Sequence, residues 1–306
     1  MGKIAFVFPG QGAQHPGMGK SLYENSKTAK EIYDMAESIN SGIIEMSFNG
    51  TPEQLKQTKN TQPCLYLANL TAALTLLEKG IKPDVVAGFS LGELSALAFA
   101  GAFSAEDGFK MVLKRGAFMQ EASEAVNTKM AAVIKCESKE IEEVCSKFEN
   151  VYPVNYNSQL QTVVSGMADE IELFKEEMLK HSCRVMDLPV SGAFHSPFMN
   201  EAASKFKSEL KGYTFNQPSI PVYANSSAKP YSGDIASALE IQMKSPVKWC
   251  DTILNMAEDG VDTFIETGTG KTLSGLIKRI IPGCKIYSCE EYEDIINTAE
   301  AVKADA

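Results

Sequence analysis

The turn that decides the fold lies within Asp84-Val85-Val86-Ala87-Gly88-Phe89-Ser90-Leu91-Gly92-Glu93. It joins a short, mostly apolar run, residues 84–88, directly to a run of small and apolar residues, 91–100. The first run is typical of a buried strand and the second of a helix packed closely on it. A strand that enters a helix through Gly-x-Ser-x-Gly predicts a tight turn that exposes the hydroxyl of Ser90.

The segments around this turn repeat the alternation of strand and helix signals. Residues 3–8 are typical of a buried strand, and residues 61–79 of a helix that stops at Gly80. Ser104 has the sequence context of an N-cap for a helix that runs to about residue 125. Such alternation favours an α/β fold in which helices cover both faces of a parallel sheet.

The pattern changes between residues 127 and 192. Segments there are typical, in order, of strand, helix, strand, strand, helix and strand: 130–135, 139–148, 152–156, 162–165, 169–181 and 184–189. This is the order of a ferredoxin-like α+β domain. We therefore predict a small ferredoxin-like domain at 127–192, inserted into a large, hydrolase-like parallel-sheet domain that comprises 1–126 and 193–306.

The last third of the chain returns to α/β signals. Strands are expected at 220–225, 261–266 and 284–289. Ser245 and Pro246 have the pattern of an N-cap followed by the first residue of a helix.

Composition excludes several classes of protein. The 306 residues carry a formal net charge of −10, whereas a nucleic-acid binder needs a dense basic surface. No apolar run approaches the roughly 20 residues that a membrane span requires. We therefore expect a water-soluble protein that binds neither nucleic acid nor membrane.

Cysteine and histidine usage points to a cytoplasmic protein without a metal. The seven cysteines are scattered, odd in number and nowhere spaced as C-x-x-C, so reduced thiols are expected. The apolar strand pattern starts at residue 3 and leaves no room for a signal peptide. Three histidines far apart in the sequence predict no catalytic metal site.

A nucleophilic Ser90 needs a general base, and the chain offers His15, His181 and His195. His181 ends a charged amphipathic segment, which favours a solvated helix end. His15 lies in a glycine-rich loop, and His195 lies among the small and turn residues 191–197. The residues alone do not choose between these two loop histidines.

Arg115 falls on the apolar face of its predicted helix, together with Met111, Phe118 and Met119. An arginine on such a face needs an anion. One possibility is a buried ion pair with an aspartate or glutamate. The other is a bound carboxylate, which a planar guanidinium holds through two parallel hydrogen bonds.

Five segments, in this order, resemble the malonyl-CoA:acyl carrier protein transacylase family of type II fatty acid synthesis, which is related to the acyltransferase domains of polyketide synthases. They are residues 8–12, residues 88–93, Arg115-Gly116 with Met119-Gln120, residues 192–196 and residues 246–249. The resemblance runs nearly end to end. It implies transfer of a malonyl group from malonyl-CoA to the phosphopantetheine thiol of acyl carrier protein, by a ping-pong mechanism through malonyl-Ser90.

The resemblance also assigns roles in catalysis. It implies that His195 is the general base and that the backbone N–H groups of Gln11 and Leu91 form the oxyanion hole. The backbone carbonyl of Gln242 would orient the histidine, so the identity of that side chain would matter little.

Substrate binding is implied for a second set of residues. Arg115 would hold the free malonyl carboxylate, and Gln11, Asn157 and Phe194 would line the pocket, with Phe194 crowding branched acyl groups. Asn225 matches another asparagine of the family's pocket. Phe89 replaces a usual histidine, which should make that pocket wall apolar.

The resemblance implies an enzyme without cofactor or metal, whose substrates are malonyl-CoA and acyl carrier protein, and we expect a monomer. Because the family's carrier proteins are acidic, a local basic patch should bind the carrier. The candidates are Lys244, Lys248, Lys271, Lys278 and Arg279.

Three alternatives stay open. The first is a stand-alone acyltransferase of a polyketide synthase, and the second is a serine esterase or thioesterase that uses the same turn. Esterases usually place an aspartate or glutamate before the histidine and have no arginine toward the acyl group. The third is an inactive scaffold that binds the carrier protein.

Overall fold

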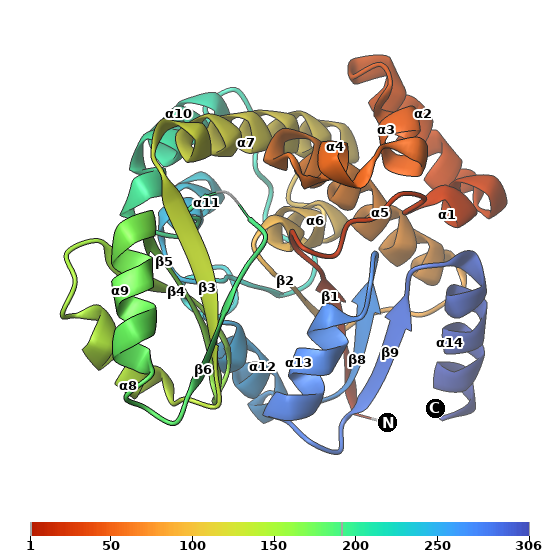
Figure 1. Cartoon of the computed structure of the whole chain (residues 1–306). Helices are drawn as coiled ribbons and strands as arrows, with labels where there is room; N and C mark the ends of the chain where they lie inside the picture. Colours follow the sequence, from red (N-terminus) through yellow and green to blue (C-terminus); the bar gives the residue numbers. More distant parts are fainter. Residues whose placement is uncertain (1, 191, 306) are drawn as a thin grey trace.

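Two sheets organise the chain in the computed structural model, which describes residues 2–190 and 192–305 (Figure 1). Met1, Ser191 and Ala306, which fall within the domain segments predicted at 1–126, 127–192 and 193–306, lie outside the described residues. The larger sheet is parallel throughout, in the order β7-β2-β1-β8-β9. Its strands are β1 (Lys3–Phe8), β2 (Val85–Gly88), β7 (Val222–Tyr223), β8 (Val261–Thr267) and β9 (Lys285–Cys289).

Alternation along β1 shows why this sheet needs helices on both faces. Phe6 and Phe8 point into one apolar core, where they meet helices α5 (Thr58–Glu78), α6 (Leu91–Phe99) and α7 (Ala105–Ala125). Val7 points into the other core, with α12 (Trp249–Glu258) and α13 (Thr272–Ile280). A parallel strand buried on both faces is a continuous apolar run in sequence, as β1 is. The predicted fold class is confirmed.

The smaller sheet is antiparallel and has the order β4-β5-β3-β6. Its elements follow the predicted order: β3 (Thr128–Ile134), α8 (Ser138–Cys145), β4 (Val151–Ser158), β5 (Gln161–Met167), α9 (Ala168–Met178) and β6 (Arg184–Asp187). This is the ferredoxin-like topology, with both helices packed on one face of the sheet (Figure 1). The division of the chain at residues 127 and 192 stays a prediction.

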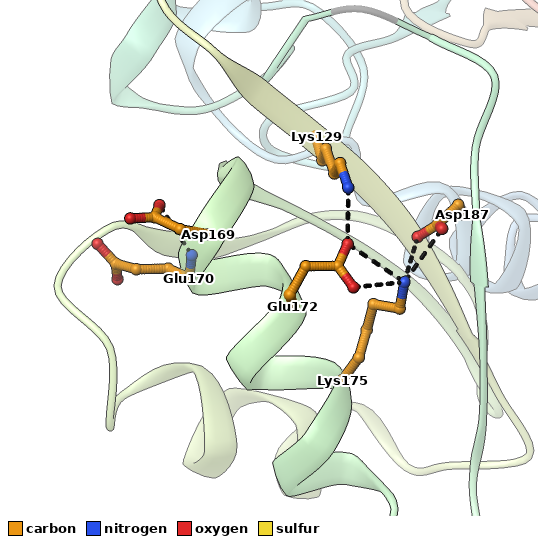
Figure 2. A network of polar contacts seen from close by, with 6 residues as sticks. All are labelled: Lys129, Asp169, Glu170, Glu172, Lys175 and Asp187. Atoms are coloured by element: carbon orange, nitrogen blue, oxygen red, sulfur yellow. Dashed lines mark hydrogen bonds and ion pairs between the residues drawn. The ribbon is translucent and has the colours of Figure 1, made fainter.

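A network of ion pairs ties α9 to two strands of the small sheet (Figure 2). Lys129 of β3 lies 2.7 Å from Glu172, and Lys175 lies 3.0 Å from both Glu172 and Asp187 of β6. These side chains are partly exposed, so each pair contributes at most about 1 kcal/mol to stability.

The prediction of a helix start at Ser245 and Pro246 is wrong. Ser245 instead follows α11 (Ile235–Lys244) as its C-cap, and α12 begins at Trp249. Between them, buried Val247 pairs with β4: its N–H donates to the carbonyl of Val154, and its carbonyl accepts from the N–H of Tyr156. These tertiary hydrogen bonds outweigh the local preference of Ser-Pro for a helix start.

The remaining helices include several that the sequence interpretation left unassigned, between residues 20 and 56. They are α1 (Lys20–Asn25), α2 (Lys27–Ile39), α3 (Ile43–Asn49), α4 (Pro52–Lys56), the short η1 (Pro197–Met199), α10 (Asn200–Leu210) and α14 (Tyr292–Ala304). A reciprocal capping box between Thr51 and Gln54 starts α4. Among the described residues, no helix is both long and apolar enough to cross a bilayer.

Candidate active site

Ser90 lies on the turn between β2 and α6, with φ 52° and ψ −106°. A side chain rarely adopts such a conformation, and it persists only where neighbouring structure imposes it. Here the close approach of strand and helix does so. A Cβ at Gly88 would lie 1.9 Å from the carbonyl carbon of Gly92, and one at Gly92 would lie 2.0 Å from the carbonyl oxygen of Phe8. Only glycine at both positions lets α6 begin so close to the sheet.

Asn225 supports this turn from the segment after β7. Its Oδ1 accepts from the N–H of Ser90 at 2.7 Å, and its Nδ2 donates to the carbonyl of Gly88 at 2.6 Å. The resemblance matched Asn225 to a pocket asparagine. In the structure, this buried amide binds the backbone of the turn itself.

His195 is the histidine that the fold brings to Ser90. Its Nε2 lies 2.7 Å from Ser90 Oγ, and its Nδ1 lies 2.9 Å from the carbonyl of Gln242. Since a carbonyl only accepts, Nδ1 carries the proton and Nε2 presents its lone pair to the hydroxyl. This is the arrangement of a nucleophile with its general base.

The other two histidines pair with carboxylates elsewhere. His15 binds Glu290, and Nδ1 of His181 lies 2.5 Å from Glu140. Both are partly exposed, and neither lines the cavities beside Ser90. The predicted solvated helix end at His181 is therefore corrected to a carboxylate-paired position.

Arg115 is fully buried beside the nucleophile. Nη1 donates to Oε1 of Gln62 at 2.8 Å, Nη2 donates to Oε1 of Gln242 at 2.9 Å, and Nη2 lies 3.4 Å from Ser90 Oγ. Within the part of the chain that the structure describes, no carboxylate forms an ion pair with it at 4.0 Å or less. The predicted alternative of a buried ion pair is thus not what the structure has.

The charge of this guanidinium persists despite its burial. Burial lowers the pKa of Arg115 to about 10, so it stays protonated at neutral pH. Its Nε is buried and has no partner among the described residues. A buried cation whose hydrogen-bond partners are all neutral, two amides and a hydroxyl, can bind an anion.

Two adjoining cavities lie beside the nucleophile, and Ser90 lines the inner one. The inner one, about 80 Å³, is lined by Ser90 and His195 and also by Gln11, Leu91 and Phe194. The outer one, about 240 Å³, extends toward α13. The two share four lining residues: Gln11, Phe89, Asn155 and Leu188.

The outer cavity contains a pair of asparagines, of which the sequence interpretation found one. Asn155 and the predicted Asn157 both line it, and the Oδ1 atoms of both are buried without a partner in the described structure. They are two residues apart on β4, so their side chains project to one face of the strand. That alternation was the signal that could have found Asn155.

Phe89 lies in the walls of both cavities and packs edge-on against Trp249, with 5.6 Å between ring centroids. This position agrees with the expected apolar wall.

Residues 5–279 match the model of the acyl transferase domain family. The chain belongs to this family. The malonyl CoA-acyl carrier protein transacylase of Bacillus subtilis (strain 168) is 39% identical to this chain over an alignment of 313 residues, gaps included. The alignment covers 100% of this chain and 99% of the relative. The crystal structure of a malonyl CoA-acyl carrier protein transacylase from Clostridium perfringens superposes with a TM-score of 0.95 at 35% identity, covering 99% of this chain and 98% of that one.

A third comparison includes a carrier protein. It is a malonyl-transacylase in complex with the acyl-carrier protein of a type II polyketide synthase, with a TM-score of 0.94 at 31% identity. The match covers 98% of this chain and 99% of that one.

The structure of this acyltransferase corrects the expectation that the Gln242 side chain matters little. Its main-chain carbonyl does accept a hydrogen bond from His195, as predicted. Its side chain also forms hydrogen bonds to other residues of the site. Oε1 accepts from Arg115, and Nε2 donates to the carbonyl of Ser90 at 2.7 Å and to Glu93 at 3.3 Å. One glutamine thus orients both the base and the arginine.

Gln242→Ala should lower the free energy of unfolding of the acyltransferase by about 1.5–3 kcal/mol, because it removes a hydrogen bond to a buried charged group. Chemical denaturation measures this, and Gln217→Ala, an exposed glutamine, is the matched control, with a change within about 0.5 kcal/mol. Equal effects of both changes would contradict the contacts assigned to Gln242.

Glu93 is a buried acid that the sequence interpretation gave no role. It accepts hydrogen bonds from Tyr231, from the N–H of Asn225 and from Gln242. Burial raises the pKa of Glu93 to about 7. A glutamate within a run of small apolar helix residues indicates a buried acid, and this pattern could have identified Glu93 from the sequence.

The general base His195 should stay unprotonated, and so remain active, at low pH. Burial, and next the positive charge of Arg115, lower the pKa of His195 to about 4. A lowered pKa keeps the base neutral as the pH falls, so serine acylation should not decline with a midpoint near 6.5. Single-turnover rates from pH 5 to 8 in the parent and in Glu93→Gln test this.

In that experiment, an inflection near pH 7 in the parent alone belongs to Glu93. A midpoint near 6.5 that persists in Glu93→Gln would show that His195 titrates as a solvated histidine.

Proposed function

We propose that this acyltransferase transfers a malonyl group from malonyl-CoA to the phosphopantetheine thiol of acyl carrier protein in fatty acid synthesis, through a malonyl ester of Ser90. One observation carries the proposal. Ser90 Oγ lies 2.7 Å from the lone-pair nitrogen of His195 and 3.4 Å from the buried guanidinium of Arg115. A nucleophile, its base and a group that binds carboxylates converge on one atom.

In the first half-reaction, Ser90 Oγ attacks the thioester carbonyl of malonyl-CoA while His195 Nε2 takes its proton. Negative charge develops on the carbonyl oxygen. The N–H groups of Gln11 and Leu91 stabilise it, together with the positive end of the α6 dipole, because Leu91 begins that helix. The intermediate collapses, the C–S bond breaks, and His195 returns the proton to the coenzyme A thiolate.

In the second half-reaction, the malonyl group passes from Ser90 to the carrier. His195 takes the proton of the carrier's phosphopantetheine thiol, and the sulfur attacks the malonyl ester. The ester C–O bond then breaks, and Ser90 regains its proton from the imidazolium. Each proton and each bond is accounted for by the two substrates and these two side chains, so the cycle uses no cofactor and no metal.

Arg115 supports malonyl as the acyl group. Its guanidinium would bind the free carboxylate by two parallel hydrogen bonds, held in place by Gln62 and Gln242. Phe194 lines the inner cavity and would crowd branched acyl groups. The unpartnered amide oxygens of Asn155 and Asn157 would accept from the amide N–H groups of the pantetheine arm in the outer cavity.

The esterase alternative fits the site less well. In esterases with this turn, a carboxylate orients the histidine. Here a main-chain carbonyl, that of Gln242, does so. The buried Arg115 would also be an unexplained cost in an enzyme that binds neutral acyl groups.

The direct test of the proposal supplies malonyl-CoA with and without phosphopantetheinylated carrier protein, using one carrier from fatty acid synthesis and one from a polyketide synthase. We expect malonyl-thioester to form on the fatty acid carrier much faster than malonyl-CoA is hydrolysed, and none on carrier that lacks the phosphopantetheine. Hydrolysis alone would favour an esterase. Transfer to the polyketide carrier alone would favour the polyketide alternative.

The docking surface for the carrier should lie beside α13. Three residues of this helix line the outer cavity: Thr272, Leu273 and Leu276. Lys271 directly precedes the helix, and Lys278 lies on its last turn. Of the other predicted lysines, Lys244 pairs with Glu240 at 2.7 Å. Arg279, the fifth candidate, donates to Gln161 at 2.9 Å, while Lys248 is the N-cap residue of α12.

Reversing both lysine charges, with Lys271→Glu and Lys278→Glu, should slow transfer to the carrier by about twofold to 30-fold, because two exposed pairs contribute about 0.2–1 kcal/mol each. Acylation by malonyl-CoA should be unchanged, and added salt should slow the parent more than the variant. Lys82→Glu is the control, since this exposed lysine precedes the start of β2, whereas Ser90 follows its end. Equal losses in both half-reactions would contradict a docking role.

A further inference from the structure

A second cluster of reactive side chains lies at one end of the small sheet, away from Ser90. The sulfurs of Cys136 and Cys183 and a carboxylate oxygen of Glu140 all lie within 4.8 Å of one another. Neither cysteine forms a disulfide. The sequence shows no ligand-spaced cysteines, because Cys136 and Cys183 lie far apart in the chain and are brought together by tertiary structure.

Strand register explains how the cluster forms. β3 and β6 are antiparallel neighbours, with Ile134 opposite Arg184. The chain just after β3, which carries Cys136, therefore meets the chain just before β6, which carries Cys183. Glu140 comes from the first turn of α8, which follows β3 directly. Figure 1 shows the starts of α8 and β6 at this end of the sheet.

The carboxylate of Glu140 is held between a thiol and an imidazole. Cys136 Sγ donates to one oxygen, Oε2, at 3.2 Å, and His181 Nδ1 lies 2.5 Å from the other, Oε1. Cys136 is buried, with 2% exposed, whereas Cys183, Glu140 and His181 are partly exposed. One side of the cluster is thus enclosed by protein and the other is open to solvent.

We propose that Cys136, Cys183 and Glu140 bind one thiophilic divalent ion such as Zn²⁺, with His181 orienting Glu140 through its second oxygen. Thiolate sulfur and carboxylate oxygen are both donors that zinc binds, with bonds of about 2.3 Å to sulfur and about 2.0–2.2 Å to oxygen. Two sulfurs on one tetrahedral ion lie about 3.8 Å apart by these bond lengths. The observed spacing therefore needs only small side-chain shifts.

The binding step balances without a co-reactant. Each of the two thiols releases its proton to solvent as its metal–sulfur bond forms, and the ionised carboxylate adds the third bond. Water completes the four-coordinate ion on the open side. A histidine that holds the outer oxygen of a ligating carboxylate is a common way to fix the orientation of the ligand.

The ion would act on stability rather than on acyl transfer. None of Cys136, Cys183, Glu140 and His181 lines the cavities beside Ser90. The ligands join the end of β3, the first turn of α8 and the start of β6. An ion bound only by the folded chain stabilises it by mass action, and so fixes this end of the small sheet.

The test titrates reduced, chelator-treated protein with Co²⁺ and follows the thiolate-to-cobalt charge-transfer absorption, which Zn²⁺ then displaces. We expect one equivalent to bind the parent. Cys136→Ser and Cys183→Ser should abolish the absorption, whereas Cys284→Ser, a partly buried thiol outside the cluster, should retain it. His181→Ala should weaken binding by about 10- to 100-fold while the absorption persists.

Zn²⁺ should also raise the melting temperature of the parent and of Cys284→Ser, but not that of Cys183→Ser. Because Cys183 is partly exposed, its serine variant should fold, and unchanged acyl transfer verifies this. Absence of thiolate absorption in the parent, or equal affinity in the Cys183→Ser and Cys284→Ser variants, would overturn the proposal. So would a parent protein in which dissolved oxygen converts Cys136 and Cys183 to a disulfide in the presence of Zn²⁺, seen as the loss of two hydrogens in intact mass.

Discussion

His195→Ala should slow acylation of Ser90 by malonyl-CoA by about 10²–10⁴-fold, the usual contribution of a positioned general base. The reason is geometric: Nε2 lies 2.7 Å from the serine oxygen, and the Nδ1–H bond to Gln242 leaves it unprotonated. Rapid-quench measurement of coenzyme A release in a single turnover gives the rate directly.

The control for this change is His15→Ala, which removes another loop histidine, one paired with Glu290. It should leave the acylation rate within a fewfold of the parent. If the two variants were equally slow, or if His195→Ala kept a near-normal rate, a different group would be taking the proton from Ser90.

Arg115→Ala should reduce the efficiency with malonyl-CoA by between about 30-fold and several thousand-fold. Losing one partner of a desolvated, hydrogen-bonded charge pair costs about 2–5 kcal/mol, and about 1.4 kcal/mol corresponds to a factor of ten. Acetyl-CoA has no free carboxylate, so its efficiency should stay unchanged or rise. Arg115→Lys should rescue poorly, because one ammonium cannot reproduce the paired hydrogen bonds.

The measurement is the ratio of kcat/KM for malonyl-CoA to that for acetyl-CoA in the parent and in the variants. Lys114→Ala is the matched control, since this neighbour on α7 is exposed, and its ratio should equal that of the parent. If both substrates decline equally in Arg115→Ala, the arginine holds the site together but does not select the acyl group.

Features set by local sequence were predictable. The turn at Ser90 follows from a strand, two glycines and a helix that are adjacent in the chain, and the ferredoxin-like order follows from six consecutive segments. The N-cap at Ser104 is equally local, and its side chain accepts from the N–H of Asp107. In such places, the nearest neighbours in sequence are also the nearest in space.

Features set by tertiary contacts were missed or depended on the family resemblance. Ser-Pro at 245–246 has a local helix preference, but the pairing of Val247 with β4 prevails. His195 could not be separated from His15 by its surroundings in sequence. The side-chain role of Gln242 depends on Arg115 and Ser90, which lie on other elements and are far away along the chain. The Cys136–Cys183 cluster depends on strand register in the same way.

In the proposed reaction, Ser90 carries the acyl group between the two substrates. The most direct measurement is the intact mass of the protein after brief exposure to malonyl-CoA, followed by peptide mapping. We expect the addition of one malonyl group to the parent, located on the peptide that contains Ser90, and no addition to Ser90→Ala. A malonyl group that persists in Ser90→Ala, or that maps to another peptide of the parent, would contradict the proposed reaction.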